Sequence, residues 1–161
     1  MPVLTCGELG LRPLRDLLSR YSLSLDMVDV GQPITGSWFG EPEAGIVGTE
    51  IIVRADTPVH SALHESCHVI CMDKQRRAKL HTDAGGDYDE ENGVCYLQIL
   101  LGDYLSGFSR QRMMQDMDEW GYTFRLGSAQ NWFEADAEDA RAWLLQYQLI
   151  DDQNQPTWKL R

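Results

Sequence analysis

The four histidines of this 161-residue chain lie within one short segment, and three of them are spaced four residues apart. Side chains at positions i and i+4 of an α-helix lie one turn apart on the same face. A helical segment would therefore place His60, His64 and His68 on a single stripe. This spacing constrains the local fold more than any other pattern in the sequence, and it predicts a histidine-bearing helix over about residues 58–72.

The remaining patterns predict an α+β fold in a single domain spanning residues 1–161. Residues 23–53 alternate β-branched and aromatic residues with glycines, which is typical of short strands joined by turns. A first helix is expected at residues 13–21, before this small sheet. Thr57 and Pro58 suit the cap and first turn of the histidine helix. Apolar residues at helical spacing predict three further helices after a polar loop, at about residues 89–105, 109–120 and 131–149.

The composition supports a globular chain and limits its partners. With 43% apolar residues, the domain can bury a sizeable core. The formal net charge of −11 argues against a nucleic-acid partner, because phosphate binding needs a basic face. Neutral or basic substrates remain open, including a lysine-rich protein surface. The sequence near its start does not resemble a signal peptide and no stretch is apolar enough for a membrane, so a cytoplasmic protein is expected.

The histidine helix contains the motif His64-Glu65-Ser66-Cys67-His68, which has the form HExxH. Two imidazoles one helical turn apart can converge on one ion at about 2.0–2.1 Å. The glutamate between them is then placed to act as a general base on a metal-activated water. The motif therefore predicts a single divalent metal ion held by His64 and His68, with Glu65 as the catalytic residue.

A third ligand is expected from the acidic start of the next helix, where Glu90 and Glu91 are the candidates. On a helical projection Glu90 shares the apolar stripe of Val94, whereas Glu91 falls beside Gln98. A carboxylate aimed at the interior needs a compensating partner, which a metal ion would supply. This argument favours Glu90 over Glu91 as the third ligand, and both remain candidates. Acidic residues also stabilise a solvated helix N-terminus, which is the alternative for either glutamate.

The cysteines and His60 offer other arrangements. Cys67 and Cys71 project near the face of the metal-binding histidines, and with Cys95 they could form a mixed Cys/His zinc site. Such a site normally uses a CxxC knuckle, which this chain lacks, so free thiols buried by packing are favoured. His60 is either a further ligand, a hydrogen-bond partner of a ligand, or a surface residue.

The HExxH segment, with a glutamate on a following helix, resembles the zincin metallopeptidases and in particular their gluzincin branch. The resemblance implies a minimal zincin-like fold, with His64, His68 and either Glu90 or Glu91 as zinc ligands and Glu65 as general base. It implies a Zn²⁺-dependent hydrolase in which activated water attacks an amide or similar carbonyl. A protein or peptide would be the substrate.

A second resemblance extends over residues 61–68, 73–77 and 90–91, which look like the corresponding parts of bacterial elongation factor P hydroxylases. That resemblance implies Fe²⁺ in the same set of two histidines and one carboxylate, serving oxygen chemistry on a protein side chain. In that family the side chain is a lysine of a translation factor. A third hypothesis is that the chain binds the metal but catalyses no reaction, and is a metal-stabilised binding module.

Overall fold

The computed structural model describes residues 2–161 and has the predicted α+β class, with a small sheet in the N-terminal half and helices after it. Within these residues the α-helices and strands follow one another in this order: α1 (Cys6–Leu9), α2 (Leu11–Ser19), β1 (Ser24–Met27), β2 (Gly45–Val47), β3 (Glu50–Val53), α3 (Val59–Cys71), α4 (Lys74–Ala78), α5 (Tyr88–Leu101), α6 (Arg110–Trp120), α7 (Ala129–Ala135) and α8 (Glu138–Gln146). Short 3₁₀ helices follow α5 and precede α7.

The three-stranded sheet has the order β1-β3-β2. The central strand β3 pairs parallel with β1, placing Leu25 opposite Ile51, and antiparallel with β2, placing Ile46 opposite Ile51. The side chains of Ile46 and Ile51 are fully buried. The sheet therefore adds one wall to the hydrophobic core against the helices.

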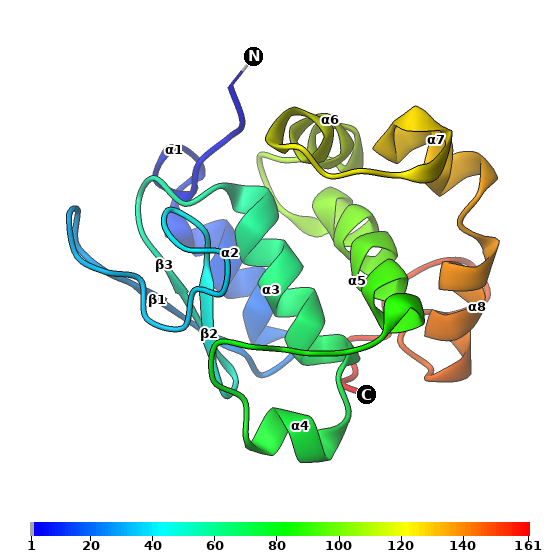
Figure 1. Cartoon of the computed structure of the whole chain (residues 1–161), viewed down its shortest axis with the longest axis horizontal. Coiled ribbons are helices and arrows are strands. Elements are labelled where there is room, and N and C mark those ends of the chain that lie inside the picture. The colour runs from blue at the N-terminus through cyan, green and yellow to red at the C-terminus, as the bar shows by residue number, and fades with distance from the viewer. Residues whose placement is uncertain (1) are drawn as a thin grey trace.

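Two helices, α3 and α5, lie side by side at the centre of the molecule (Figure 1). The sheet, α1 and α2 lie on one side of this pair, and α6, α7 and α8 pack around α5 on the other. None of the helices formed by residues 2–161 combines the length and apolar character that crossing a bilayer requires. The predicted histidine helix is thus a central element of the fold.

Every residue of α3 is buried, including its polar ones. A helix buried on all sides must satisfy its polar groups internally, because unpaired polar groups are costly away from water. Ser61 Oγ accepts a hydrogen bond from the Ala44 amide at 2.9 Å, and Ser66 Oγ donates to the Ala62 carbonyl at 2.6 Å. Each histidine of α3 has a partner in α5 or in the segment after α6, whereas the buried His60 Nε2 and His68 Nδ1 have none among residues 2–161.

The structure differs from the sequence predictions most clearly in the following respects. Thr57 does not cap α3; its hydroxyl accepts a hydrogen bond from the Arg54 amide in the preceding turn, and Pro58 is the cap residue. The polar loop contains the short helix α4. The helix predicted over residues 131–149 is two helices, α7 and α8, because Asp136 adopts a non-helical backbone conformation between them.

Candidate metal centre

Three side chains converge between α3 and α5. The Nε2 atoms of His64 and His68 lie 3.1 Å apart. Glu91, in the first turns of α5, places one carboxylate oxygen 3.3 Å from His64 Nε2 and the other 3.1 Å from His68 Nε2. Among residues 2–161 this is the group of histidine, cysteine and carboxylate side chains that could hold a metal ion. The predicted pair of imidazoles therefore does face one point, with one glutamate beside it.

Gln98 fixes which nitrogen of His64 faces that point. Its amide nitrogen donates to the His60 carbonyl oxygen at 2.9 Å, and a carbonyl can only accept. The Gln98 amide oxygen must then face His64, and it accepts the Nδ1 proton at 2.8 Å. The Nε2 atom of the neutral imidazole is consequently left with its lone pair directed at His68 and Glu91.

The geometry of these groups fits a divalent metal ion. Ligand atoms bound to one ion at 2.0–2.1 Å in a tetrahedral arrangement lie about 3.3 Å apart. The three observed separations, 3.1, 3.3 and 3.1 Å, are close to that spacing. Zinc and Fe²⁺ both bind to donor sets of two imidazoles and one carboxylate. The hydrogen bond from His64 Nδ1 to Gln98 orients one of these imidazoles, as is usual for histidines that bind metals.

Electrostatics at the same point favour a positive charge. Burial alone would raise the pKa of Glu91, but hydrogen bonds with His64 and His68 outweigh it and hold the pKa well below its usual range. Burial would lower the pKa of His64, yet the groups of Tyr122, Cys95 and Glu91 that face it hold the pKa well above its ordinary value, whereas burial lowers the pKa of His68. The group therefore stabilises a cation, so that a metal ion and a proton compete for it.

Glu90, which the helical projection favoured, does not join this group. Its carboxylate is buried, as predicted, but it pairs with two arginines instead of facing the histidines. Arg76 Nη2 lies 2.6 and 2.7 Å from its two oxygens, and Arg161 Nη1 lies 3.0 Å from one of them. These cations supply the compensation that the prediction assigned to a metal, and Glu91 is the carboxylate beside the imidazoles.

Arg161 joins the end of α3 to the start of α5, and Arg77 donates hydrogen bonds to the end of α3. The last carbonyls of a helix have no partner within it. Arg77 donates to the carbonyls of Val69 at 2.8 Å and Met72 at 2.6 Å, and Arg161 donates to that of Cys71 at 3.2 Å. Since Arg161 also holds Glu90, the helix ends that carry His68 and Glu91 are tied together.

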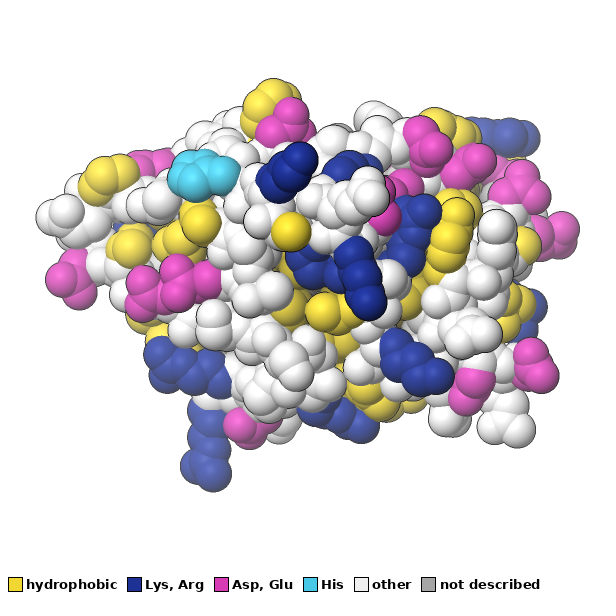
Figure 2. Space-filling model, turned by 90° about the horizontal axis from the view of Figure 1, so that it is seen from below, with side chains coloured by type: hydrophobic (Ala, Val, Ile, Leu, Met, Phe, Trp, Pro, Cys, Tyr) yellow, Lys and Arg dark blue, Asp and Glu magenta, His cyan; other side chains and the backbone are white. Residues whose placement is uncertain are grey.

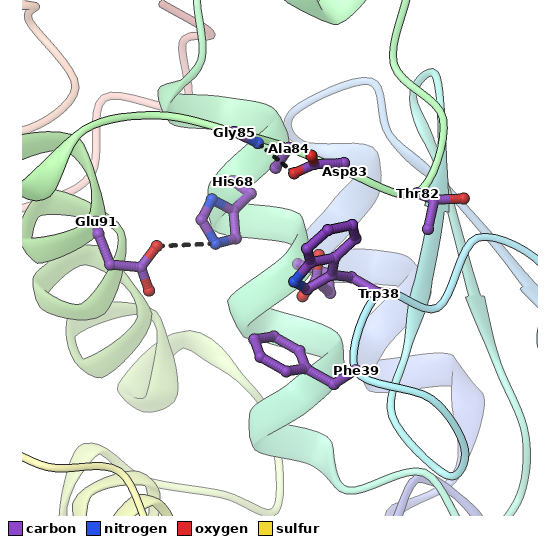
Figure 3. Close-up of a pocket in the computed structure, with 9 residues that line it drawn as sticks. Trp38, Phe39, His68, Thr82, Asp83, Ala84, Gly85 and Glu91 are labelled. Atoms are coloured by element: carbon purple, nitrogen blue, oxygen red, sulfur yellow. Dashed lines mark hydrogen bonds and ion pairs between the residues drawn. The ribbon is translucent and has the colours of Figure 1, made fainter.

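Glu65 lines a hollow next to the group that could hold a metal ion. This hollow has a volume of about 160 Å³ and is bounded by Trp38, Phe39, His68, Glu91 and the segment 82–85. Figure 3 shows the two aromatic rings on one side of His68 and the carboxylate of Glu91 on the other. Burial, opposed by the nearby His64, raises the pKa of Glu65 to about 7. A carboxyl group with this pKa can accept and return a proton near neutral pH.

A second hollow, of about 380 Å³, lies on the other side of the group and shares Phe39 and Glu91 with the first. Its other walls include Glu43, Trp120 and Tyr122. Glu43 accepts a hydrogen bond from Trp120 Nε1 at 2.6 Å. No lysine or arginine lines either hollow within residues 2–161. A ligand reaching the metal would pass between aromatic and acidic side chains.

Comparison of the chain with protein-family models, curated proteins and solved structures finds no match. The assignment of this centre therefore rests on its own geometry and chemistry.

The other residues weighed from the sequence lie outside the group. His60 is buried, with Nδ1 3.2 Å from the Tyr122 hydroxyl, so it contacts the wall of the second hollow. All four cysteines are free and buried, and among residues 2–161 none belongs to the group that could hold a metal. Cys95 does lie next to His64. The mixed Cys/His site is not assembled.

Two residues of the site were missed from the sequence, Gln98 and Tyr122. A signal for Gln98 existed, because Glu91, Cys95 and Gln98 follow one another at helical spacing and Gln98 is the one amide in the otherwise apolar second half of α5. Tyr122 follows α6 in a polar segment, and no local pattern places it beside His64. Its ring meets that of His64 edge-on, with 5.6 Å between the ring centroids.

Proposed function

We propose that this chain is a Zn²⁺-dependent hydrolase of the zincin type, with His64, His68 and Glu91 as ligands and Glu65 as general base. The observation that carries the proposal is the convergence of two imidazole nitrogens and one carboxylate at 3.1–3.3 Å, next to a second, buried carboxylate. When bound, zinc in such a site supplies a Lewis acid that makes water a nucleophile near neutral pH.

The side chains of the two hollows define the remaining roles. Glu65 would take the proton of the attacking water at its carboxylate and return it to the leaving nitrogen. Tyr122 lines the same hollow as His64, and its hydroxyl would donate a hydrogen bond to the substrate carbonyl as negative charge develops there. Gln98 keeps His64 in the tautomer that leaves Nε2 free to bind the metal.

The lining of the hollows indicates the substrate. Carboxylates of Glu43, Glu65, Asp83 and Glu91 border them together with His64 and His68, and no lysine or arginine of residues 2–161 does. An acidic substrate would be repelled, whereas neutral or basic protein or peptide segments fit both this charge and the exposed aromatic ring of Trp38.

The alternative is an Fe²⁺-dependent hydroxylase acting on a protein side chain. It is supported by the donor set, because two histidines and one carboxylate also form the ligand set of non-haem iron oxygenases. Such an enzyme has no evident use for the buried carboxyl group of Glu65, whereas hydrolysis needs it. For that reason hydrolysis ranks first. A metal-stabilised module without turnover would likewise leave Glu65 without a role.

Elemental analysis of protein purified with and without oxygen tests the centre before any substrate is known. The proposal expects about one zinc per chain in both preparations and loss of that zinc in His64→Ala. Iron retained in the anaerobic preparation alone would favour the hydroxylase, and absence of any metal would refute the centre.

Turnover is then measured on a mixture of synthetic peptides by mass spectrometry. Cleavage that disappears in Glu65→Gln while the metal stays bound is the expected result. Cleavage unchanged in Glu65→Gln would refute the assigned role of this residue.

A further inference from the structure

One face of this acidic protein is strongly basic. Residues 11–20, 73–79 and 158–161 contain nine of the fourteen basic side chains and two of the twenty-five acidic ones, giving these segments a formal charge of +7. The rest of the chain then carries −18. Figure 2 shows lysine and arginine side chains gathered across the lower face of the molecule, with aspartate and glutamate mostly towards its edges.

The three segments adjoin one another in space. The Arg20 guanidinium lies 3.4 Å above the ring of Trp158, which joins the end of α2 to the C-terminal segment. Arg77 in α4 donates to the Arg161 carbonyl at 2.9 Å, which joins the C-terminal segment to α4. The charge is therefore concentrated on one continuous surface, which we call the basic face.

The cations of the basic face are largely free to meet a partner. Of the fourteen basic side chains, six form ion pairs with carboxylates within residues 2–161, while Arg77 and Arg141 bond to uncharged oxygens. The remaining six all lie on the three segments and all are exposed, namely Arg12, Arg15, Arg20, Lys74, Lys79 and Lys159. Free cations are thus confined to this face.

Aromatic side chains lie among these cations. Trp158 stacks under Arg20 and meets the half-exposed ring of Tyr104 at a centroid distance of 5.3 Å. Arginine, tryptophan and tyrosine are the residues most enriched at the energetic centres of protein–protein interfaces. A surface that combines cations with aromatic rings fits a protein partner better than a partner that is bound through charge alone.

We propose that the basic face, centred on Arg20 and Trp158 and flanked by α4, docks an acidic surface of a partner protein. A nucleic acid is disfavoured because its charge continues beyond the face, where the rest of the chain carries −18 and repels it. The segment 82–85 that lines the first hollow follows α4 in the chain after three intervening residues. A protein docked there would lie near the entrance to the metal centre.

Two variants of equal net charge test the proposal. The first is Arg15→Gln/Lys74→Gln/Lys79→Gln, which removes three exposed cations of the basic face. The second introduces three negative charges outside the three segments, at Gln32, Gln111 and Gln115, each replaced by Glu. Both changes bring the formal charge from −11 to −14. Circular dichroism checks that each variant is folded.

The probes are a labelled sixteen-residue peptide of Asp and Glu with interspersed Leu and Phe, and a single-stranded RNA of the same length, measured by fluorescence anisotropy. The peptide is expected to bind the parent chain, weakening with salt, and to bind the basic-face variant about tenfold less tightly, since each exposed ion pair changes affinity roughly twofold. Binding to the second variant should stay close to that of the parent chain.

Three results would overturn the proposal. These are no salt-dependent peptide binding, equal weakening in both variants, or tighter binding of the RNA than of the peptide. If the basic-face variant does not fold, Arg20→Gln/Lys159→Gln replaces it, with the same expectation at a smaller fold-change. His64→Ala, which removes a metal ligand, should bind the peptide as the parent does, so failure of the metal centre and failure of the docking surface are distinguishable.

Discussion

Gln98 offers a sharp test of the metal centre, because it touches the metal-binding group only through His64. Replacement by Leu keeps the side-chain volume similar but removes the acceptor 2.8 Å from His64 Nδ1 and the donor 2.9 Å from the His60 carbonyl. Gln98 is completely buried, so water cannot replace either bond. The His64 ring then loses the group that selects its tautomer and holds its orientation.

The expected magnitude follows from these contacts. Loss of an outer hydrogen bond to a metal-binding histidine typically weakens metal affinity about 10- to 100-fold, or roughly 1.4–2.7 kcal/mol. Separately, a buried donor left unpaired costs about 1–3 kcal/mol of the free energy of unfolding. We therefore expect Gln98→Leu to remain folded, to be less stable, and to bind Zn²⁺ at least about tenfold more weakly.

Competition with a chromophoric chelator measures the Zn²⁺ dissociation constant, and urea unfolding of metal-free protein measures the stability. Gln98→Glu is the matched variant, because its carboxylate can still accept the His64 proton while losing the donation to His60. It should retain most of the metal affinity despite lower stability. Wild-type affinity in a folded Gln98→Leu protein would refute the assignment of the His64 tautomer.

Glu91→Gln removes the charged ligand and should weaken Zn²⁺ binding at least about tenfold, whereas Glu90→Gln should mainly lower the free energy of unfolding, by about 1–3 kcal/mol, since it strips two arginines of their partner. Chelator competition and urea unfolding separate the two effects, and the reverse pattern would exchange the roles of these glutamates. Gly93→Ala should lower the free energy of unfolding by roughly 1–3 kcal/mol, because a β-carbon there would lie 2.6 Å from a ring carbon of Trp143. An unchanged urea midpoint would show instead that α8, which carries Trp143, moves away without loss of stability. Removal of metal by a chelator should lower the Tm, and calorimetry at increasing free Zn²⁺ should raise it again; a Tm independent of zinc contradicts specific binding to the folded state.

Glu90 and Glu91 show which features of the site could be predicted from the sequence and which could not. The helical period correctly placed Glu90 on the buried face of its helix, because that inference needs only local geometry. The conclusion that a metal neutralises it was wrong, since Arg161 comes from the far end of the chain and no periodicity reveals it. Local patterns predict which face is buried, but long-range contacts decide what a buried charge meets.

The same distinction holds for the rest of the molecule. The histidine spacing on α3 and the glycine-rich strand region led to the correct fold class. The break between α7 and α8 was missed because apolar spacing continues across Asp136. Trp38 is 59% exposed at the edge of the first hollow, a position that no periodic pattern of the sequence predicts because it is set by the turn that carries this residue.

The burial of α3 on every side also bears on how such a protein can change. A substitution on this helix that altered the chemistry would disturb the central packing at once, so few are tolerable. The turn with Trp38 and Phe39, and the segment around Tyr122 that follows α6, border the hollows from outside that helix. The shape of the hollows can therefore change through these peripheral walls while α3 stays constant.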